Sequence, residues 1–178
     1  MKKMLILGMI ASLFIGCETG YKVDSNRSQK SENLSMEDFD LHYQEEVPET
    51  KFEGGYINDG LDLGAIRVSE SRDAVRLVLD SYRLDASGKR VDKVNRVGVY
   101  SFVYYPEKRL LSGSIHGYRK FSANLPHFAP ESIIEKIYMD KNPEDTGFRF
   151  HIKFRDNVNV KVFDLKNPGR IVIDAQLF

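Results

Sequence analysis

The sequence predicts an all-β domain, an antiparallel β-sandwich or a partly open barrel, and two observations indicate it. The segment FRFHIKFR alternates between apolar and basic side chains, a period of two that is typical of a strand with one buried face. The apolar side comprises Phe148, Phe150, Ile152 and Phe154, and the basic side comprises Arg149, His151, Lys153 and Arg155. Other β-branched and aromatic runs follow one another without a helical pattern of about 10 to 15 residues between them, which argues against βαβ units.

Three strands are expected in the first part of this domain, in residues 74–84, 96–105 and 109–121. The first alternates and ends in the turn-rich DASGKR, and the second is rich in β-branched and aromatic residues and stops before a proline. The third contains Gly113 and Gly117, which predict a bulge or a close backbone approach.

The last part of the chain is expected to complete the sheets. Residues 132–140 fit either a short helix or a strand, and NVNVKVFDL with GRIVIDA predicts a closing hairpin that turns at Asn-Pro-Gly. With that turn, Lys161 faces Asp174, and Asp164 points to the other side of the hairpin. The two carboxylates then cannot act on one substrate, and Asp174 is expected to pair with Lys161.

The N-terminus, MKKMLILGMIASLFIGC, is typical of a secretory signal: two lysines, an apolar run too short to span a bilayer comfortably, and small residues. Its ending, FIGC, resembles a bacterial lipobox, although Phe14 stands where leucine is usual. The resemblance implies that residues 1–16 are removed and that Cys17 is lipidated and anchors the protein in a membrane. The alternative is an ordinary secretory signal followed by an incidental cysteine. Glu18, where an aspartate often signals inner-membrane retention, favours an outer-membrane location facing the periplasm, if the host has an outer membrane.

Charge divides the rest of the chain in two. Residues 17–60 are predicted to be a disordered tether, with 11 acidic and 4 basic side chains after Cys17, whereas residues 61–178 form the β domain, with 20 basic and 15 acidic ones. Residues 34–43 fit a short helix or a docking motif, or are disordered like the rest of the tether. The basic domain either faces an anionic polymer or surface, or is shielded by its own tether. Zero net charge and export both argue against a nucleic-acid partner.

Two segments carry a family resemblance: DAVRLVLD at residues 73–80 and VFDLKNPGRIVID at residues 162–174. In this order, the strands of residues 64–175 resemble the AMIN-like domain of bacterial envelope proteins and lipoproteins. Ala74 departs from the family, where an arginine is usual. The resemblance implies a β-sandwich-like fold, residence in the cell envelope and, from the related AMIN domains, peptidoglycan binding or targeting. It brings no catalytic residues.

No enzyme chemistry is indicated by the titratable residues. The histidines lack metal-ligand spacing and the only cysteine is assigned to the anchor, so no metal or other cofactor is expected; these histidines are His42, His116, His127 and His151. Ser114 and His116 would share one face of a strand, but no nucleophile elbow and no orienting acid accompany them.

The best functional candidate is the basic side of residues 148–155, where successive side chains stand about 6 to 7 Å apart and suit a polymer with carboxylates. Lys161 and Arg170 are expected to widen this side from the closing hairpin. The candidate ligand-binding residues are therefore Arg149, His151, Lys153, Arg155, Lys161 and Arg170. The alternative is a solvated outer face.

These observations together predict a non-enzymatic, lipid-anchored cell-envelope protein whose β domain binds peptidoglycan or another wall polymer. The alternative is an accessory subunit that binds a protein partner in an envelope assembly. A flat polar face favours the polymer, and a contiguous exposed apolar patch favours the protein partner.

Replacing Cys17 with serine tests the anchor. The lipid is attached to the cysteine sulfur, so the Cys17→Ser protein is expected to move from the membrane fraction to the soluble fraction. Immunoblots of fractionated cells measure this, and unchanged fractionation would contradict lipidation.

Overall fold

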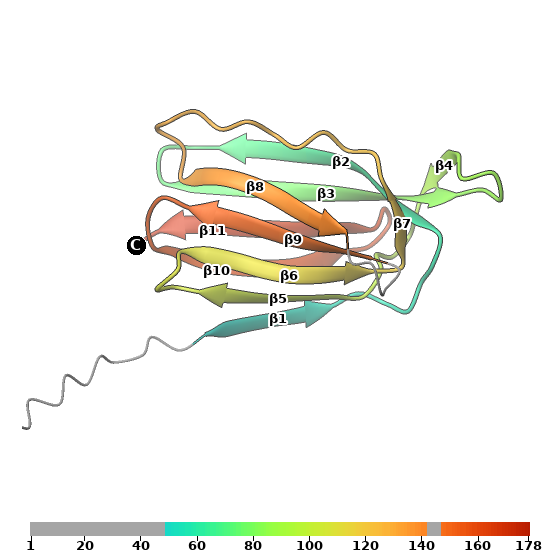
Figure 1. The fold of residues 1–178 in the computed structure, drawn as a ribbon, viewed down its shortest axis with the longest axis horizontal. Helices are drawn as coiled ribbons and strands as arrows, with labels where there is room; N and C mark the ends of the chain where they lie inside the picture. Colours follow the sequence, from blue (N-terminus) through green and yellow to red (C-terminus); the bar gives the residue numbers. More distant parts are fainter. Residues whose placement is uncertain (1–48, 142–146) are drawn as a thin grey trace, which may run out of the picture. The chain divides into compact units, whose positions relative to one another are not determined.

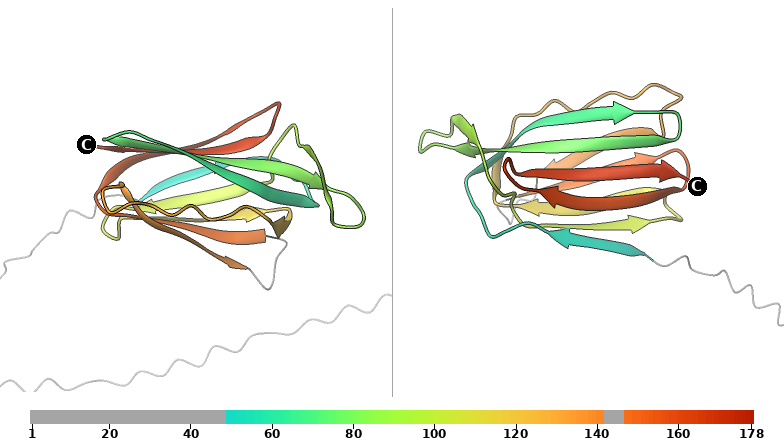
Figure 2. Two further views of the ribbon diagram at one scale, coloured as in Figure 1. Left: turned by 90° about the horizontal axis from the view of Figure 1, so that it is seen from above. Right: turned by 180° about the vertical axis from the view of Figure 1, so that it is seen from behind.

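The computed structural model describes residues 49–141 and 147–178, which fold as a β-sandwich of two sheets (Figures 1 and 2). The five-stranded sheet has the spatial order β1 (Thr50–Gly54), β5 (Tyr100–Tyr105), β6 (Leu110–His116), β9 (Gly147–Phe154) and β8 (Ile134–Lys141). The six-stranded sheet has the order β10 (Val158–Leu165), β11 (Arg170–Leu177), β3 (Ala74–Leu84), β2 (Leu61–Glu70) and β7 (Tyr118–Phe121), with β4 (Arg90–Lys93) paired to β3. The expected all-β class is confirmed.

Neighbouring strands run antiparallel, except that β7 lies parallel to β2. The parallel pair follows from a break at Gly117, where the single expected strand divides into β6 and β7. Gly117 has a φ of 82°, and a Cβ there would overlap the carbonyl oxygen of Asn58. The predicted close backbone approach is therefore confirmed. None of the described segments is a helix that is long and apolar enough to cross a membrane.

The strand β9 shows the expected alternation, because Phe150, Ile152 and Phe154 are all buried between the sheets. Phe102 on β5 meets Phe150 edge to face, with 6.4 Å between the ring centroids. The six-stranded sheet supplies the facing side chains, which include Leu63, Leu77, Leu79, Ile171 and Ile173. The two sheets therefore share one hydrophobic core.

Residues 132–140, which fitted a helix or a strand, provide the edge strand β8. Ile137 faces Ile152 and Met139 faces Phe150, so the inward side chains match those of β9. An irregularity between Ile134 and Lys136 shifts the register and leaves Lys136 exposed. A shift of this kind blurs the period of two in the sequence.

The predicted tether extends too far, because the sandwich begins at Thr50 and not at residue 61. Thr50–Gly54 pairs with β5, and its one large apolar side chain, Phe52, packs against the core. The neighbouring Lys51 and Glu53 point outward and form an ion pair of 2.7 Å. A short edge strand between charged residues has too little periodicity to be recognised in the sequence. The signal peptide, Cys17 and residues 17–48 of the tether lie outside the described residues.

The buried hydroxyl of Tyr118 is satisfied within the core. It lies 2.6 Å from Ser81 Oγ, and both side chains are almost fully buried. Burial raises the pKa of Tyr118 to about 12, because the phenolate would be desolvated there. The hydroxyl pair therefore joins β7 to β3 without an unpaired polar group.

Truncating one buried and one exposed phenylalanine is expected to distinguish core positions from outer-face positions by the loss in the free energy of unfolding. Phe150→Ala removes a ring of 0% exposure and is expected to lower the free energy of unfolding by about 3 to 5 kcal/mol. Phe163→Ala removes a ring of 36% exposure on β10 and is expected to cost less than about 1.5 kcal/mol. Urea denaturation measures both, and equal losses would contradict the assignment of the core.

Candidate functional site

The structure divides the six predicted ligand-binding residues between the two sheets. Arg149, His151 and Lys153 lie on the outer face of β9 in the five-stranded sheet, and Arg155 follows directly after that strand. Lys161 and Arg170 lie on β10 and β11 in the six-stranded sheet (Figure 2). The prediction that the closing hairpin widens the basic side of β9 is therefore wrong, because the chain changes sheets between β9 and β10 and the two outer faces point in opposite directions.

Three of the remaining four side chains make local contacts: Arg155, His151 and Lys153. The Arg155 Nε donates to the Ser132 carbonyl oxygen at 3.1 Å, which ties the end of β9 to the start of β8. The His151 side chain is only 14% exposed; its ring stacks on Tyr138 with 4.7 Å between centroids, and its Nε2 lies 3.6 Å from the Asp140 carboxylate. His151 is therefore covered by β8 and presents little surface to a ligand.

A lysine that the sequence did not single out completes the cationic part of this face. Lys136 on β8 stands directly opposite Lys153 on β9. Like charges in that arrangement repel each other. The Lys153 amine donates to the carbonyl oxygen of Lys108, and the Lys136 amine lies 5.6 Å from the Tyr138 ring centroid. Among the described residues, neither lysine forms an ion pair, so both charges remain uncompensated.

The β8–β9 face is defined here as Lys136, Tyr138, Arg149, His151 and Lys153. The next strand, β6, presents hydroxyl groups beside it: Ser112 faces His151, and Ser114 faces Arg149. Ser114 Oγ lies 2.9 Å from His116 Nε2, so these two side chains share one face, as expected for a strand. Cations and hydroxyls are thus arranged side by side on adjoining strands of a sheet.

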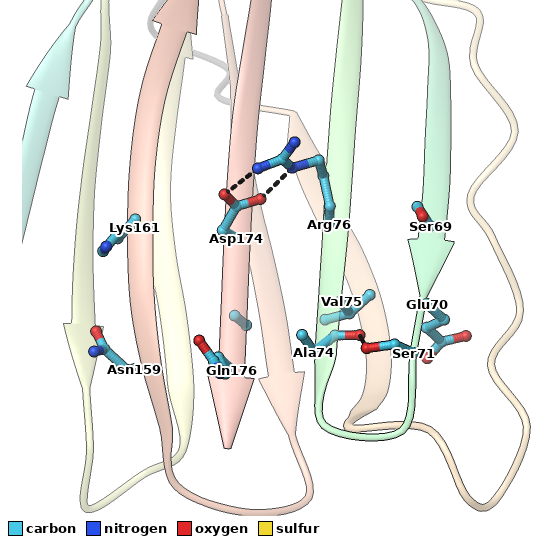
Figure 3. Close-up of a pocket in the computed structure, with 11 residues that line it drawn as sticks. Ser69, Glu70, Ser71, Ala74, Val75, Arg76, Asn159, Lys161, Asp174 and Gln176 are labelled. Carbon is cyan, nitrogen blue, oxygen red and sulfur yellow. Dashed lines mark hydrogen bonds and ion pairs between the residues drawn. The ribbon is translucent and has the colours of Figure 1, made fainter. Parts of the chain in front are cut away.

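The outer face of the six-stranded sheet has a different electrostatic character. Arg76 on β3 donates two hydrogen bonds of 2.7 Å to Asp174 on β11 (Figure 3). Arg67 on β2 likewise donates to both carboxylate oxygens of Asp80, at 2.7 and 3.1 Å. Cross-strand pairs therefore neutralise much of the charge on this face.

The expected register of the closing hairpin is confirmed, and Lys161 does face Asp174. The expected ion pair between them is not formed, because both oxygens of Asp174 accept hydrogen bonds from Arg76 on the other side of β11. Lys161 instead borders an open groove of about 420 Å³ that also contains Asn159 and Gln176 (Figure 3). Asp164 accepts a hydrogen bond from Tyr100 at 3.2 Å, which separates it from Asp174 as predicted.

Within residues 49–141 and 147–178, no three His, Cys, Asp or Glu side chains gather closely enough to hold a metal ion.

Comparisons of the chain with protein-family models, with curated proteins and with solved structures found no match. The resemblance to the AMIN-like domain therefore stays a prediction. The hairpin that carries the clearest part of the resemblance folds with the expected register. That agreement concerns the hairpin and does not identify a family.

A double-mutant cycle is expected to identify the true partner of Asp174. Arg76→Met and Asp174→Asn together should show a coupling of about 0.5 to 1 kcal/mol, because the pair is bidentate although partly exposed. Lys161→Met with Asp174→Asn should show a coupling near zero. The free energy of unfolding in urea measures both cycles, and a larger coupling to Lys161 would contradict the observed geometry.

Proposed function

We propose that this chain is a non-enzymatic, lipid-anchored protein of the cell envelope whose β domain binds peptidoglycan or another anionic wall polymer through the β8–β9 face. The observation that carries the proposal is the pair Lys136 and Lys153, two like charges that the sheet register holds opposite each other. The lipobox-like FIGC at Cys17 supports the anchor and the location. In a cell with an outer membrane, Glu18 favours that membrane, facing the periplasm.

The uncompensated lysines favour an anionic ligand on electrostatic grounds. Directly opposed residues in an antiparallel pair have Cβ atoms about 4.5 to 5.5 Å apart, an unfavourable arrangement for like charges, and here the Lys153 amine is directed to the Lys108 carbonyl oxygen and the Lys136 amine to the Tyr138 ring. A carboxylate or phosphate placed between them converts this repulsion into two attractive contacts. The Asp140 carboxylate lies beside His151 and opposite Arg149, and is not placed between the two lysines.

The arrangement along the strand favours a polymer over a small molecule. Arg149 and Lys153 are four residues apart on β9, a separation of about 13 Å at the rise of a strand. The hydroxyls of Ser112 and Ser114 lie on the next strand and add hydrogen-bonding groups suited to sugars. A repeating chain with carboxylates would meet cations and hydroxyls in succession.

The alternative, an accessory subunit that binds an envelope protein, is favoured by a different observation. Phe163 and Leu165 are 36% and 39% exposed and lie two residues apart on the outer face of the edge strand β10. Exposed apolar side chains on one face are typical of protein interfaces. This surface lies on the sheet opposite the β8–β9 face, so the two functions can be tested separately.

Co-sedimentation with purified sacculi tests the polymer function. The mature chain, residues 17–178 with Cys17→Ser, is expected to pellet with sacculi, and Lys136→Glu with Lys153→Glu is expected to weaken this binding more than about tenfold. Arg149→Glu is expected to weaken it further. The matched control is Lys161→Glu with Arg170→Glu, which makes the same change in net charge on the other sheet and should leave binding unchanged.

The controls also define what would contradict the proposal. A wild-type chain that does not pellet would exclude sacculus binding. Equal losses in both double variants would indicate a response to net charge and not a site. Far-ultraviolet circular dichroism of each variant checks that the sandwich remains folded.

A further inference from the structure

The loop between β1 and β2 presents an unusual side chain at the end of the sandwich. Ile57 is 99% exposed, the highest value among the large apolar side chains that the structure describes. Its neighbour Tyr56 is 37% exposed. An isolated exposed apolar residue is common on proteins, so the inference depends on what surrounds Ile57.

The loop that carries Ile57 is held in place on both sides. The Tyr56 amide donates to the Val97 carbonyl at 3.1 Å. Gly55 has a φ of 81° and lies so close to Gly98 that a Cβ would overlap its carbonyl oxygen. On the other side of Ile57, Asp59 is paired with Arg119, whose guanidinium lowers the pKa of that carboxyl. The exposure of Ile57 is therefore set by the fold.

Two cations flank the exposed aromatic ring. The Arg96 guanidinium carbon lies 4.0 Å and the Lys166 amine 5.4 Å from the centroid of the Tyr56 ring. Within the part of the chain that the structure describes, neither Arg96 nor Lys166 forms an ion pair. Ile57 follows Tyr56 directly in the chain, so the exposed isoleucine lies on the same loop as the ring that the two cations contact.

The acids near this end are fewer than its cations, so it keeps a positive excess. Asp59 pairs with Arg119 and Asp92 lies 3.6 Å from Arg83, whereas Asp164 accepts a hydrogen bond from the neutral Tyr100 hydroxyl at 3.2 Å, keeps its charge and offsets one of the two cations. Arg96 and Lys166 are therefore available to an external anion.

We propose that this loop end binds the surface of a phospholipid bilayer. Ile57 enters the boundary between headgroups and acyl chains, the Tyr56 ring lies at headgroup level, and Arg96 and Lys166 contact lipid phosphates. A wall polymer offers no apolar interior to a fully exposed isoleucine, whereas a bilayer offers both the apolar interior and the phosphates. The membrane is thus the occupant that matches both halves of the surface.

The predicted anchor makes such a contact effective even if it is weak. Residues 17–48 connect Cys17 to the domain and reach up to about 100 Å when extended. The strand β1 begins at the end of the sandwich opposite the Ile57 loop (Figure 1), and this reach lets either end approach the membrane. Tethering raises the local concentration of the domain at the bilayer, so the second contact needs little affinity of its own.

Vesicle co-sedimentation of the mature chain, residues 17–178 with Cys17→Ser, tests the proposal without the lipid. Binding to vesicles of phosphatidylethanolamine and phosphatidylglycerol is expected, and Ile57→Ser should weaken the partition about tenfold. The matched control is Phe178→Ser, because Phe178 is 93% exposed at the opposite end of the sandwich (Figure 1). That variant should bind like wild type.

Neutralising Arg96 and Lys166 tests how much the two cations contribute to vesicle binding. Arg96→Gln with Lys166→Gln should weaken binding about fivefold per cation and remove the preference for these vesicles over phosphatidylcholine vesicles. Lys136→Gln with Lys153→Gln removes two cations from the β8–β9 face and should leave vesicle binding unchanged. This control separates the membrane contact from sacculus binding.

Two results would overturn the proposal. The first is wild-type binding of the Ile57→Ser chain to the vesicles, and the second is no binding of the wild-type chain to the anionic vesicles. If the first result came with an Ile57→Ser defect in binding to sacculi or to an envelope protein, the loop would be assigned to that other partner.

Discussion

The structure depends on the burial of alternate side chains in β9. This strand lies between β6 and β8, and its inward residues Phe150 and Ile152 are completely buried against the other sheet. A slip of one residue would bring Arg149 and Lys153 into the core, which is prohibitive for unpaired charges. The same constraint that forms the core therefore fixes which cations reach the outside and how far apart they stand.

The charged side chains of the two outer faces differ in whether they are paired with opposite charges. On the six-stranded sheet, Arg76 and Arg67 are each bound to an aspartate on the neighbouring strand, so the polar groups mainly serve one another. On the five-stranded sheet, Lys136 and Lys153 stand opposite each other, and neither forms an ion pair within residues 49–141 and 147–178. The first face pairs Arg76 and Arg67 with carboxylates and leaves Lys161 without an ion pair among the described residues, whereas on the second face neither opposed lysine has such a partner.

Local features of the sequence predicted local features of the fold. The period of two in FRFHIKFR gives the inward and outward residues of β9, and Asn-Pro-Gly gives the register in which Lys161 faces Asp174. Both depend on residues close in the chain. The sheet to which each strand belongs depends on the whole topology, and for that reason the sequence predicts the wrong face for Lys161 and Arg170.

The residues of the candidate sites that the sequence does not predict also depend on the whole topology of the fold. The cation pair of the β8–β9 face includes Lys136. Its outward position depends on the register shift between Ile134 and Lys136, which interrupts the alternation of the strand and cannot be read from a period of two in the sequence. The cluster at the loop end joins Tyr56, Arg96 and Lys166 from three distant segments. Only the packed loops bring these side chains together, so proximity in the sequence gives no signal for them.

A protein can hold repelling charges on a surface when their position is determined elsewhere. Opposed like charges on a sheet cost up to about 1 kcal/mol, whereas truncating a buried phenylalanine such as Phe150 costs about 3 to 5 kcal/mol. The inner face of β9 therefore sets the register with a large margin, and Lys136 and Lys153 cannot separate by shifting the strands. The amines are directed to the Lys108 carbonyl oxygen and the Tyr138 ring, and neither forms an ion pair with a described residue, which connects the packing of the core to the binding proposed for the β8–β9 face.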